Sequence, residues 1–226
     1  MGYISVAIDG PSGAGKSTVA RAAAARLGYV YVDTGAMYRA IGLAVCRKGI
    51  SSDDTAGIVA VLPEVQLDIR YEDGAQHILL CGEDVSDAIR TPEIAKYASK
   101  VSAVPEVRQF LLETQRDMAK NGNILMDGRD IGTVILPDAP VKIFLTASAE
   151  ARAQRRYLEL HEKGQSITFD EVLHDIQQRD EQDMTRAVAP LKQAADAVLL
   201  DTSDISLEQS IEAVLRIIRE RVEDKP

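Results

Sequence analysis

Hydrophobic residues along this chain follow two alternating patterns. Short apolar runs predict buried strands at residues 3–8, 29–32, 124–127, 141–145 and 197–200. Apolar positions at helical spacing predict helices at residues 19–27, 36–47, 51–62, 92–101, 105–120, 149–163, 169–181 and 207–222. Strands that alternate with helices are typical of a parallel sheet covered by helices, so we predict an α/β fold of three layers around a five-stranded parallel sheet.

The pattern changes between residues 64 and 87. Two short alternating segments, 66–71 and 76–81, flank the pair Asp73-Gly74, which predicts a β-hairpin that a third strand at 82–85 could extend. Because a hairpin is antiparallel, we expect it outside the parallel sheet, as a small insertion on the substrate side. The helices at 149–163 and 169–181 follow one strand and lead to another, so this pair can move as a flap without disturbing the sheet.

Composition narrows the possible partners. The chain has 226 residues, 46% of them hydrophobic, and a formal charge of −9. This acidity argues against a general nucleic-acid or membrane-surface binder, which would need a positive footprint. With no export signal, no apolar run long enough to cross a bilayer and two isolated cysteines, we expect a reduced cytoplasmic protein. A self-contained fold favours a monomer.

The strongest chemical signal is a glycine-rich loop between the first strand and the first helix. It fits Gly-x-x-x-x-Gly-Lys-Ser, a pattern whose backbone N–H groups surround the phosphates of a nucleoside triphosphate. Lys16 then reaches the β- and γ-phosphates, and the Ser17 hydroxyl is placed to bind Mg²⁺. The other interpretation is a turn that only joins a strand to a helix. We therefore predict a site for ATP and Mg²⁺ that comprises Gly10, Pro11, Ser12, Gly13, Ala14, Gly15, Lys16, Ser17 and Thr18.

Polar residues follow the carboxyl ends of several predicted strands. In open parallel sheets, ligands bind beyond these ends, so one crevice should contain Asp9, Asp33, Thr34, Asp127, Arg129 and Asp130. Asp127 closes an apolar strand and is a candidate to hold Mg²⁺ through water. It could instead be an ordinary turn or capping aspartate.

Arginines supply most of the cations near this crevice. Residues 150–186 contain more acids than bases, so single guanidinium groups rather than bulk charge would have to bind phosphate. Taken one by one, the flap arginines are ordinary helix residues in ion pairs. The chain also lacks a Ser-His-Asp or Cys-His pattern and a guanine-recognition motif, which favours phosphoryl transfer to a small acceptor. The candidates are Arg39, Arg108, Arg129, Arg152, Arg155, Arg156, Arg179 and Arg186.

Five motifs in order resemble the bacterial cytidylate kinases of the long type, which carry an inserted substrate-side subdomain. They are Ile8-Asp9-Gly10-Pro11-Ser12-Gly13-Ala14-Gly15-Lys16, Asp33-Thr34-Gly35-Ala36-Met37-Tyr38-Arg39, Asp127-Gly128-Arg129-Asp130-Ile131-Gly132-Thr133, Pro137-Asp138-Ala139-Pro140-Val141-Lys142 and Arg186-Ala187-Val188-Ala189-Pro190-Leu191. Two positions depart from the commonest spelling of the family: Ser17, where Gly often follows the lysine, and Thr34, where Ser is common. Ser17 should improve the binding of Mg²⁺ or leave it unchanged, and Thr34 keeps the hydroxyl of serine, so neither departure argues against the reaction.

The resemblance implies transfer of the γ-phosphoryl group of ATP to CMP or dCMP, with Mg²⁺, on a P-loop fold. It implies a core of residues 1–35, 121–149 and 188–226, a nucleotide-monophosphate-binding region with the β insertion at 36–120, and a lid at 150–187. It also implies the acceptor-site residues: Arg39 and Arg129 on the phosphate, Ser99, Arg108 and Asp130 on cytosine, Thr34 and Tyr38 beside them, and Arg179, Asp183 and Arg186 on sugar and phosphates. Arg155 would serve the ATP side, and Lys16, Arg129, Arg179 and Arg186 would be catalytic.

Two other functions stay open on the residues alone. One is a P-loop kinase of another small acceptor, such as a nucleoside or shikimate. The other is a non-catalytic ATP-binding regulatory protein, against which the intact Lys16, Ser17 and Asp127 argue.

Overall fold

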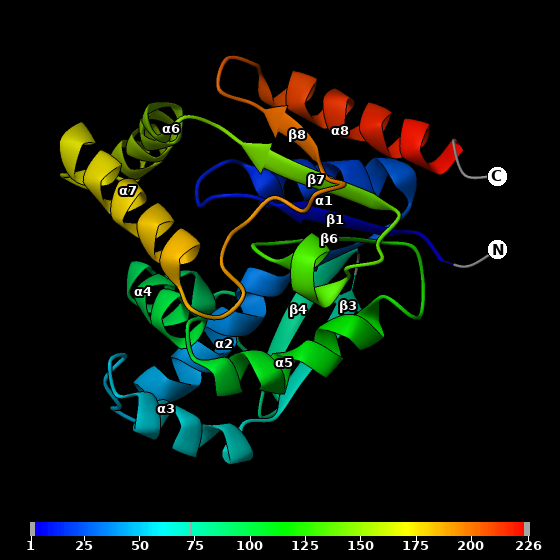
Figure 1. The fold of residues 1–226 in the computed structure, drawn as a ribbon. Coiled ribbons are helices and arrows are strands. Elements are labelled where there is room, and N and C mark those ends of the chain that lie inside the picture. Colours follow the sequence, from blue (N-terminus) through cyan, green and yellow to red (C-terminus); the bar gives the residue numbers. More distant parts are fainter. Residues whose placement is uncertain (1–2, 73, 224–226) are drawn as a thin grey trace.

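A computed structural model describes residues 3–72 and 74–223. It places five parallel strands in one sheet, in the order β2-β6-β1-β7-β8, which confirms the predicted parallel sheet (Figure 1). A separate antiparallel sheet has the order β3-β4-β5. The strands are β1 (Ser5–Asp9), β2 (Val30–Asp33), β3 (Leu67–Glu72), β4 (Ala75–Leu80), β5 (Glu83–Asp84), β6 (Ile124–Gly128), β7 (Val141–Thr146) and β8 (Val198–Asp201).

Helices cover both faces of the parallel sheet. Each predicted helix is confirmed, with ends that differ by a few residues. The helices are α1 (Lys16–Leu27), α2 (Thr34–Arg47), α3 (Thr55–Val61), α4 (Pro92–Val101), α5 (Pro105–Met118), α6 (Ala149–Glu162), α7 (Phe169–Thr185) and α8 (Leu207–Glu223). Three short turns were not predicted as separate elements: η1 (Leu62–Glu64), η2 (Ala88–Arg90) and η3 (Ile131–Ile135).

Alternating residues of the central strand face two different hydrophobic clusters. Val6 and Ile8 of β1 belong to the cluster that α1 and α8 complete, whereas Ala7 between them belongs to the cluster formed with α2, α4 and α5. All three side chains have no exposed surface. Burial on both faces explains why β1 reads as a continuous apolar run rather than an alternating one.

The β insertion is antiparallel and lies outside the parallel sheet, as predicted. Leu67 pairs with Leu80 and Glu72 with Ala75, so β3 and β4 form a hairpin whose connection is residues 73–74. Asp73 of the predicted turn lies outside the described residues, and Gly74 has a φ of 76°. The buried Ile78 and Leu80 pack into the same hydrophobic cluster as α2, which fixes the insertion against that helix.

Helices α6 and α7 stand apart from the sheet at one end of the molecule (Figure 1). They enclose a small hydrophobic cluster of their own, made of Ala153, Leu160, Val172 and Ile176. At the start of α7, Thr168 and Glu171 form a reciprocal capping box. Of the helices described, none is long and apolar enough to cross a membrane.

Candidate active site

The glycine-rich loop joins the end of β1 to α1. Gly10, Gly13 and Gly15 have positive φ values of 152°, 75° and 85°. A Cβ on Gly10 would lie 1.9 Å from the carbonyl oxygen of Leu145, so only glycine fits there. Gly15 caps α1 without a side-chain hydrogen bond, which leaves N–H groups of the first turn available to an anion.

Lys16 lies folded back over this loop. Its Nζ donates a hydrogen bond to the carbonyl oxygen of Pro11 at 2.7 Å, and only 5% of the residue is exposed. Burial, and then the positive charge of Arg129, lower the pKa of Lys16 well below its usual range. A bound phosphate would supply the negative charge that this buried ammonium lacks.

Three oxygen-bearing side chains meet where a triphosphate would carry its metal. The Ser17 hydroxyl donates to Oδ2 of Asp127 at 2.9 Å, and the Tyr31 hydroxyl donates to Oδ1 at 2.9 Å. Burial, followed by the nearby Asp33 carboxylate, raises the pKa of Asp127 to about 6. No cluster of three or more His, Cys, Asp or Glu side chains able to hold a metal occurs among residues 3–72 and 74–223. Hard oxygen donors in this small number fit Mg²⁺, which keeps most of its waters and also binds the phosphates.

At the start of α2, Asp33 and Thr34 continue this polar crevice. Asp33 Oδ1 accepts from the N–H of Ala36 at 2.9 Å and so caps the helix. The Thr34 hydroxyl donates to the carbonyl oxygen of Asp127 at 2.8 Å. Arg39 Nη1 lies 3.7 Å from Asp33 Oδ2 and, within the described chain, is buried with no hydrogen-bond partner. Such an atom can bind an incoming anion.

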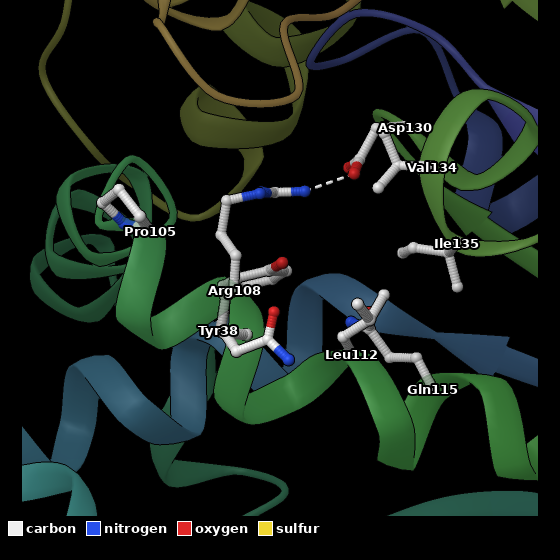
Figure 2. Close-up of a pocket in the computed structure, with 9 residues that line it drawn as sticks. Tyr38, Pro105, Arg108, Leu112, Gln115, Asp130, Val134 and Ile135 are labelled. Carbon is white, nitrogen blue, oxygen red and sulfur yellow. Dashed lines mark hydrogen bonds and ion pairs between the residues drawn. The ribbon is translucent and has the colours of Figure 1, made fainter.

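Arg108 of α5 and Asp130, which follows β6, form a buried ion pair. Arg108 Nη2 donates to Asp130 Oδ2, and its Nη1 donates to the carbonyl oxygen of Ser102 at 3.2 Å. The Tyr38 ring lies under this guanidinium, 5.6 Å from ring centroid to Cζ. The pair borders a cavity of about 120 Å³ (Figure 2). Arg108 is a hydrogen-bond donor and Asp130 an acceptor. A donor and an acceptor in a largely apolar cavity can together recognise a planar polar ring.

Residues 150–187, the segment predicted as a lid, contribute two arginines and an aspartate to the same crevice. Asp183 of α7 accepts from Arg129 Nε at 2.7 Å and lies 3.9 Å from Arg186 Nη1. Arg186 Nη2 in turn donates to Asp130 Oδ1 at 3.5 Å. Burial, and then Arg129, lower the pKa of Arg179 to about 10. The structure therefore brings most of the predicted acceptor-site residues into one network.

Two predicted residues are engaged elsewhere. Ser99 donates to Gln182 Oε1 of the lid at 3.4 Å rather than to Arg108 or Asp130. Arg155 donates to the backbone carbonyl and the hydroxyl of Thr202, beyond the end of β8. The roles given to both residues stay predictions.

Sequence reasoning gave no specific role to Arg152, which is 5% exposed. Its Nη1 donates to the carbonyl oxygen of Ser12 at 3.0 Å, and its guanidinium forms two hydrogen bonds with Asp180 of α7, at 3.0 and 2.6 Å. Asp9 accepts from the N–H groups of Ile131 and Gly132 at 2.7 and 2.8 Å. Neither role was readable from spacing, because both depend on contacts between distant segments.

These features define a P-loop phosphotransferase: a triphosphate loop at the end of a parallel strand, a second polar site across the crevice and an arginine-bearing lid. The family model described as cytidylate kinase matches residues 6–220. The chain belongs to the cytidylate kinase family.

Curated relatives resemble it over almost its full length. A cytidylate kinase of Caldicellulosiruptor saccharolyticus is 50% identical over 96% of this chain and 96% of its own. One from Thermosipho melanesiensis is 51% identical over 96% of this chain and 97% of its own. Among solved structures, an uncharacterized protein from Eubacterium ventriosum has a TM-score of 0.54 at 12% identity and covers 96% of this chain and 98% of its own, so it shares the fold.

Proposed function

We propose that this enzyme transfers the γ-phosphoryl group of MgATP to CMP and dCMP, which gives CDP or dCDP and ADP. The observation that carries the proposal is a set of cations, buried or half-buried, in the crevice between the phosphate loop and the Arg108–Asp130 pair. Lys16 and Arg179 both have lowered pKa values, first because of burial and then because of Arg129. Cations that repel one another in a desolvated crevice are stabilised by polyanionic ligands.

The donor site uses the loop and the helix that follows it. The N–H groups of residues 12–15 and of the first turn of α1 would surround the phosphates of ATP, with Lys16 turning from Pro11 toward the β- and γ-phosphates. Ser17 would bind Mg²⁺ directly, and Asp127 would bind it through water. When bound, Mg²⁺ would act as a Lewis acid and neutralise negative charge on the phosphates. Arg155 would face the ATP side.

The acceptor site uses the other half of the crevice. We assign Arg39 and Arg129 to the acceptor phosphate, since Arg39 Nη1 is buried without a hydrogen bond from the described chain. Thr34, Tyr38, Ser99, Arg108 and Asp130 would form the base side. Arg179, Asp183 and Arg186 would contact sugar and phosphates when the lid closes, and Lys16, Arg129, Arg179 and Arg186 would stabilise the charge that is transferred.

No strong base is required for this reaction. The acceptor phosphate is already ionised at neutral pH, so positioning and charge stabilisation supply the catalysis. In water, the negatively charged phosphates of the donor and the acceptor would repel each other. Guanidinium groups on both sides of the crevice would bring donor and acceptor phosphates together in line.

Cytosine would be selected by the opposite hydrogen-bonding roles of Asp130 and Arg108. The exocyclic amine of cytosine is a donor and suits a carboxylate oxygen, whereas uracil places a carbonyl oxygen at that position. Asp130 has 3% exposed surface, so a wrong base would leave it facing another acceptor without water to compensate. Discrimination against UMP of up to roughly 10⁴-fold is within the range for buried polar recognition.

The two alternatives named above are less favoured. A kinase of a neutral acceptor would need a base to deprotonate a hydroxyl. The carboxylates beside Arg39 and Arg129 are Asp33, which caps α2, and Asp183, which pairs with Arg129. A non-catalytic ATP-binding protein would have no need for a complete second polar site.

An acceptor panel tests the proposal. CMP, dCMP, UMP and AMP are assayed with MgATP, and ADP formation is coupled to a spectrophotometric readout. We expect CMP and dCMP to be good acceptors and UMP and AMP to be poor ones. Equal rates with all four, or consumption of ATP with none, would overturn it.

We also propose a cytoplasmic monomer with the three regions given above: a core, a nucleotide-monophosphate-binding region at 36–120 and a lid at 150–187. The separate hydrophobic cluster of α6 and α7 supports the lid as a unit. The separate antiparallel sheet supports the insertion as another.

A further inference from the structure

Two arginines approach the same carboxylate oxygen of Asp33. Arg90 of η2 donates from Nη1 to Asp33 Oδ2 at 3.1 Å, whereas Arg39 Nη1 lies 3.7 Å from the same oxygen without a hydrogen bond. The Asp33 side chain is 6% exposed and that of Arg90 is 47% exposed. Arg90 therefore takes one of the hydrogen-bonding positions on Oδ2 and offsets part of the negative charge that faces Arg39.

The backbone of Asp33 is held by the β insertion. Its N–H donates to Gln76 Oε1 at 2.7 Å, and Gln76 Nε2 donates to its carbonyl oxygen at 3.3 Å. Asp33 ends β2, the edge strand of the parallel sheet, and Gln76 lies in β4 of the insertion. A single carboxamide thus satisfies both polar backbone groups of Asp33, as a neighbouring strand would.

The first turn of α2 holds the carboxylate close to Arg39. A Cβ on Gly35 would lie 3.1 Å from Asp33 Oδ1 and 3.6 Å from Arg39 Nη1. With so little free space, a small shift of Asp33 would move the Arg39 guanidinium as well.

We propose that Arg90 and Gln76 are positioning residues for Arg39, and that both act through Asp33. The hydrogen bond from Arg90 offsets part of the Asp33 charge, which leaves Arg39 Nη1 free for the acceptor phosphate, while Gln76 fixes the backbone from which the carboxylate projects. Without Arg90, Asp33 draws Arg39 into a direct, hydrogen-bonded pair that competes with the phosphate. The inference rests on the proposed function, because it takes Arg39 as a ligand of the acceptor phosphate.

The test is steady-state kinetics on Arg90→Met and Gln76→Leu. Loss of a charge-assisted hydrogen bond changes affinity by roughly tenfold, so for Arg90→Met we expect the KM for CMP to rise by about that factor. We expect a rise of a few fold for Gln76→Leu. The KM for ATP should change less than twofold in both variants.

A second substitution separates positioning from general damage. Asp33→Asn keeps a helix-capping side chain but removes the charge that would capture Arg39. In the Arg90→Met background, Asp33→Asn should restore most of the lost affinity for CMP. A merely structural role of Arg90 predicts no such rescue.

Arg47→Met is the matched control. Arg47 also joins α2 to the insertion, through hydrogen bonds to Glu83 at 2.6 and 2.8 Å, but at the far end of the helix. Its substitution should leave the KM for CMP unchanged. An equal rise in this control, an unaltered KM in Arg90→Met, or failure of the Asp33→Asn rescue would overturn the inference.

The wild-type enzyme in the same experiment distinguishes failure of the proposed function from failure of this inference alone. If it does not phosphorylate CMP, the proposed function fails and the inference fails with it. If it phosphorylates CMP while Arg90→Met behaves as wild type, only the inference fails.

Discussion

Arg152 of the lid donates a hydrogen bond to the carbonyl oxygen of Ser12 in the phosphate loop, 3.0 Å away. The same guanidinium binds Asp180 of α7, whose side chain is 13% exposed. One buried side chain thus connects both lid helices to the loop that would hold ATP. We infer that this contact helps to hold α6 and α7 against the phosphate loop.

Arg152→Met should therefore damage ATP binding more than CMP binding. We expect the KM for ATP to rise by at least about tenfold and the KM for CMP to change little. Removing one partner of a buried ion pair costs about 3–5 kcal/mol, so the free energy of unfolding, measured in urea, should fall by a comparable amount. Lys163→Met is the control, because Lys163 pairs only with Glu159 on the lid surface among the contacts described. Unchanged kinetics in Arg152→Met would show that the contact has no role in ATP binding.

Lys16→Met should abolish phosphoryl transfer and leave the fold intact. Loss of a positioned cation lowers kcat by roughly 10²–10³-fold or more. Burial, and then Arg129, lower the pKa of Lys16, so the folded protein holds this charge at a cost. We therefore expect urea unfolding of Lys16→Met to show equal or higher stability than wild type. Activity at the wild-type level would remove Lys16 from the mechanism.

Asp9 should make stability fall as the pH rises. Burial raises the pKa of Asp9 from 3.8 to about 6, although Gly132 and Ile131 N–H groups oppose the rise. Between pH 3.8 and about 6, the folded protein keeps a proton on Asp9 that the unfolded chain has released. Stability from this group is therefore full below pH 3.8 and is lost as the pH increases to about 6, by about 3 kcal/mol.

Urea unfolding of wild type and Asp9→Asn across pH 4–7 checks this sign. Asparagine has a similar size and no titrating charge, so the stability of wild type relative to the variant should decrease with rising pH and level off above about 6. A difference that does not change with pH would contradict the raised pKa.

The parallel sheet and most helices could be predicted from sequence because their signals are local. Buried strands such as Ile124–Gly128 are continuous apolar runs, and helices such as Pro92–Val101 begin at a proline and an N-cap residue. The η3 turn was missed because its start is set by Asp9, which accepts from the N–H groups of Ile131 and Gly132. That cause lies more than 100 residues away in the chain.

The residues of the candidate site, too, could be predicted only where their signal is local in the sequence. The phosphate loop was readable because all its contributors are consecutive. Arg108 and Asp130 were candidates from the sequence pattern and received their cytosine role through family resemblance, but their ion pair is a tertiary contact that no spacing indicates. Gln76 carried no signal, and Arg152 was named only as one of several candidate arginines, because a polar residue on a strand or helix gains its role only from what folds against it.

The central claim is that the Asp130 carboxylate and the Arg108 guanidinium select cytosine. Its most direct test is the ratio of kcat/KM for CMP to that for UMP, measured for wild type and Asp130→Ala, with the KM for ATP determined alongside. We predict that the ratio falls by at least about 10²-fold in Asp130→Ala, while the KM for ATP stays within a few fold of wild type. A CMP-to-UMP ratio that is unchanged, or a loss shared equally between CMP and ATP, would contradict the account.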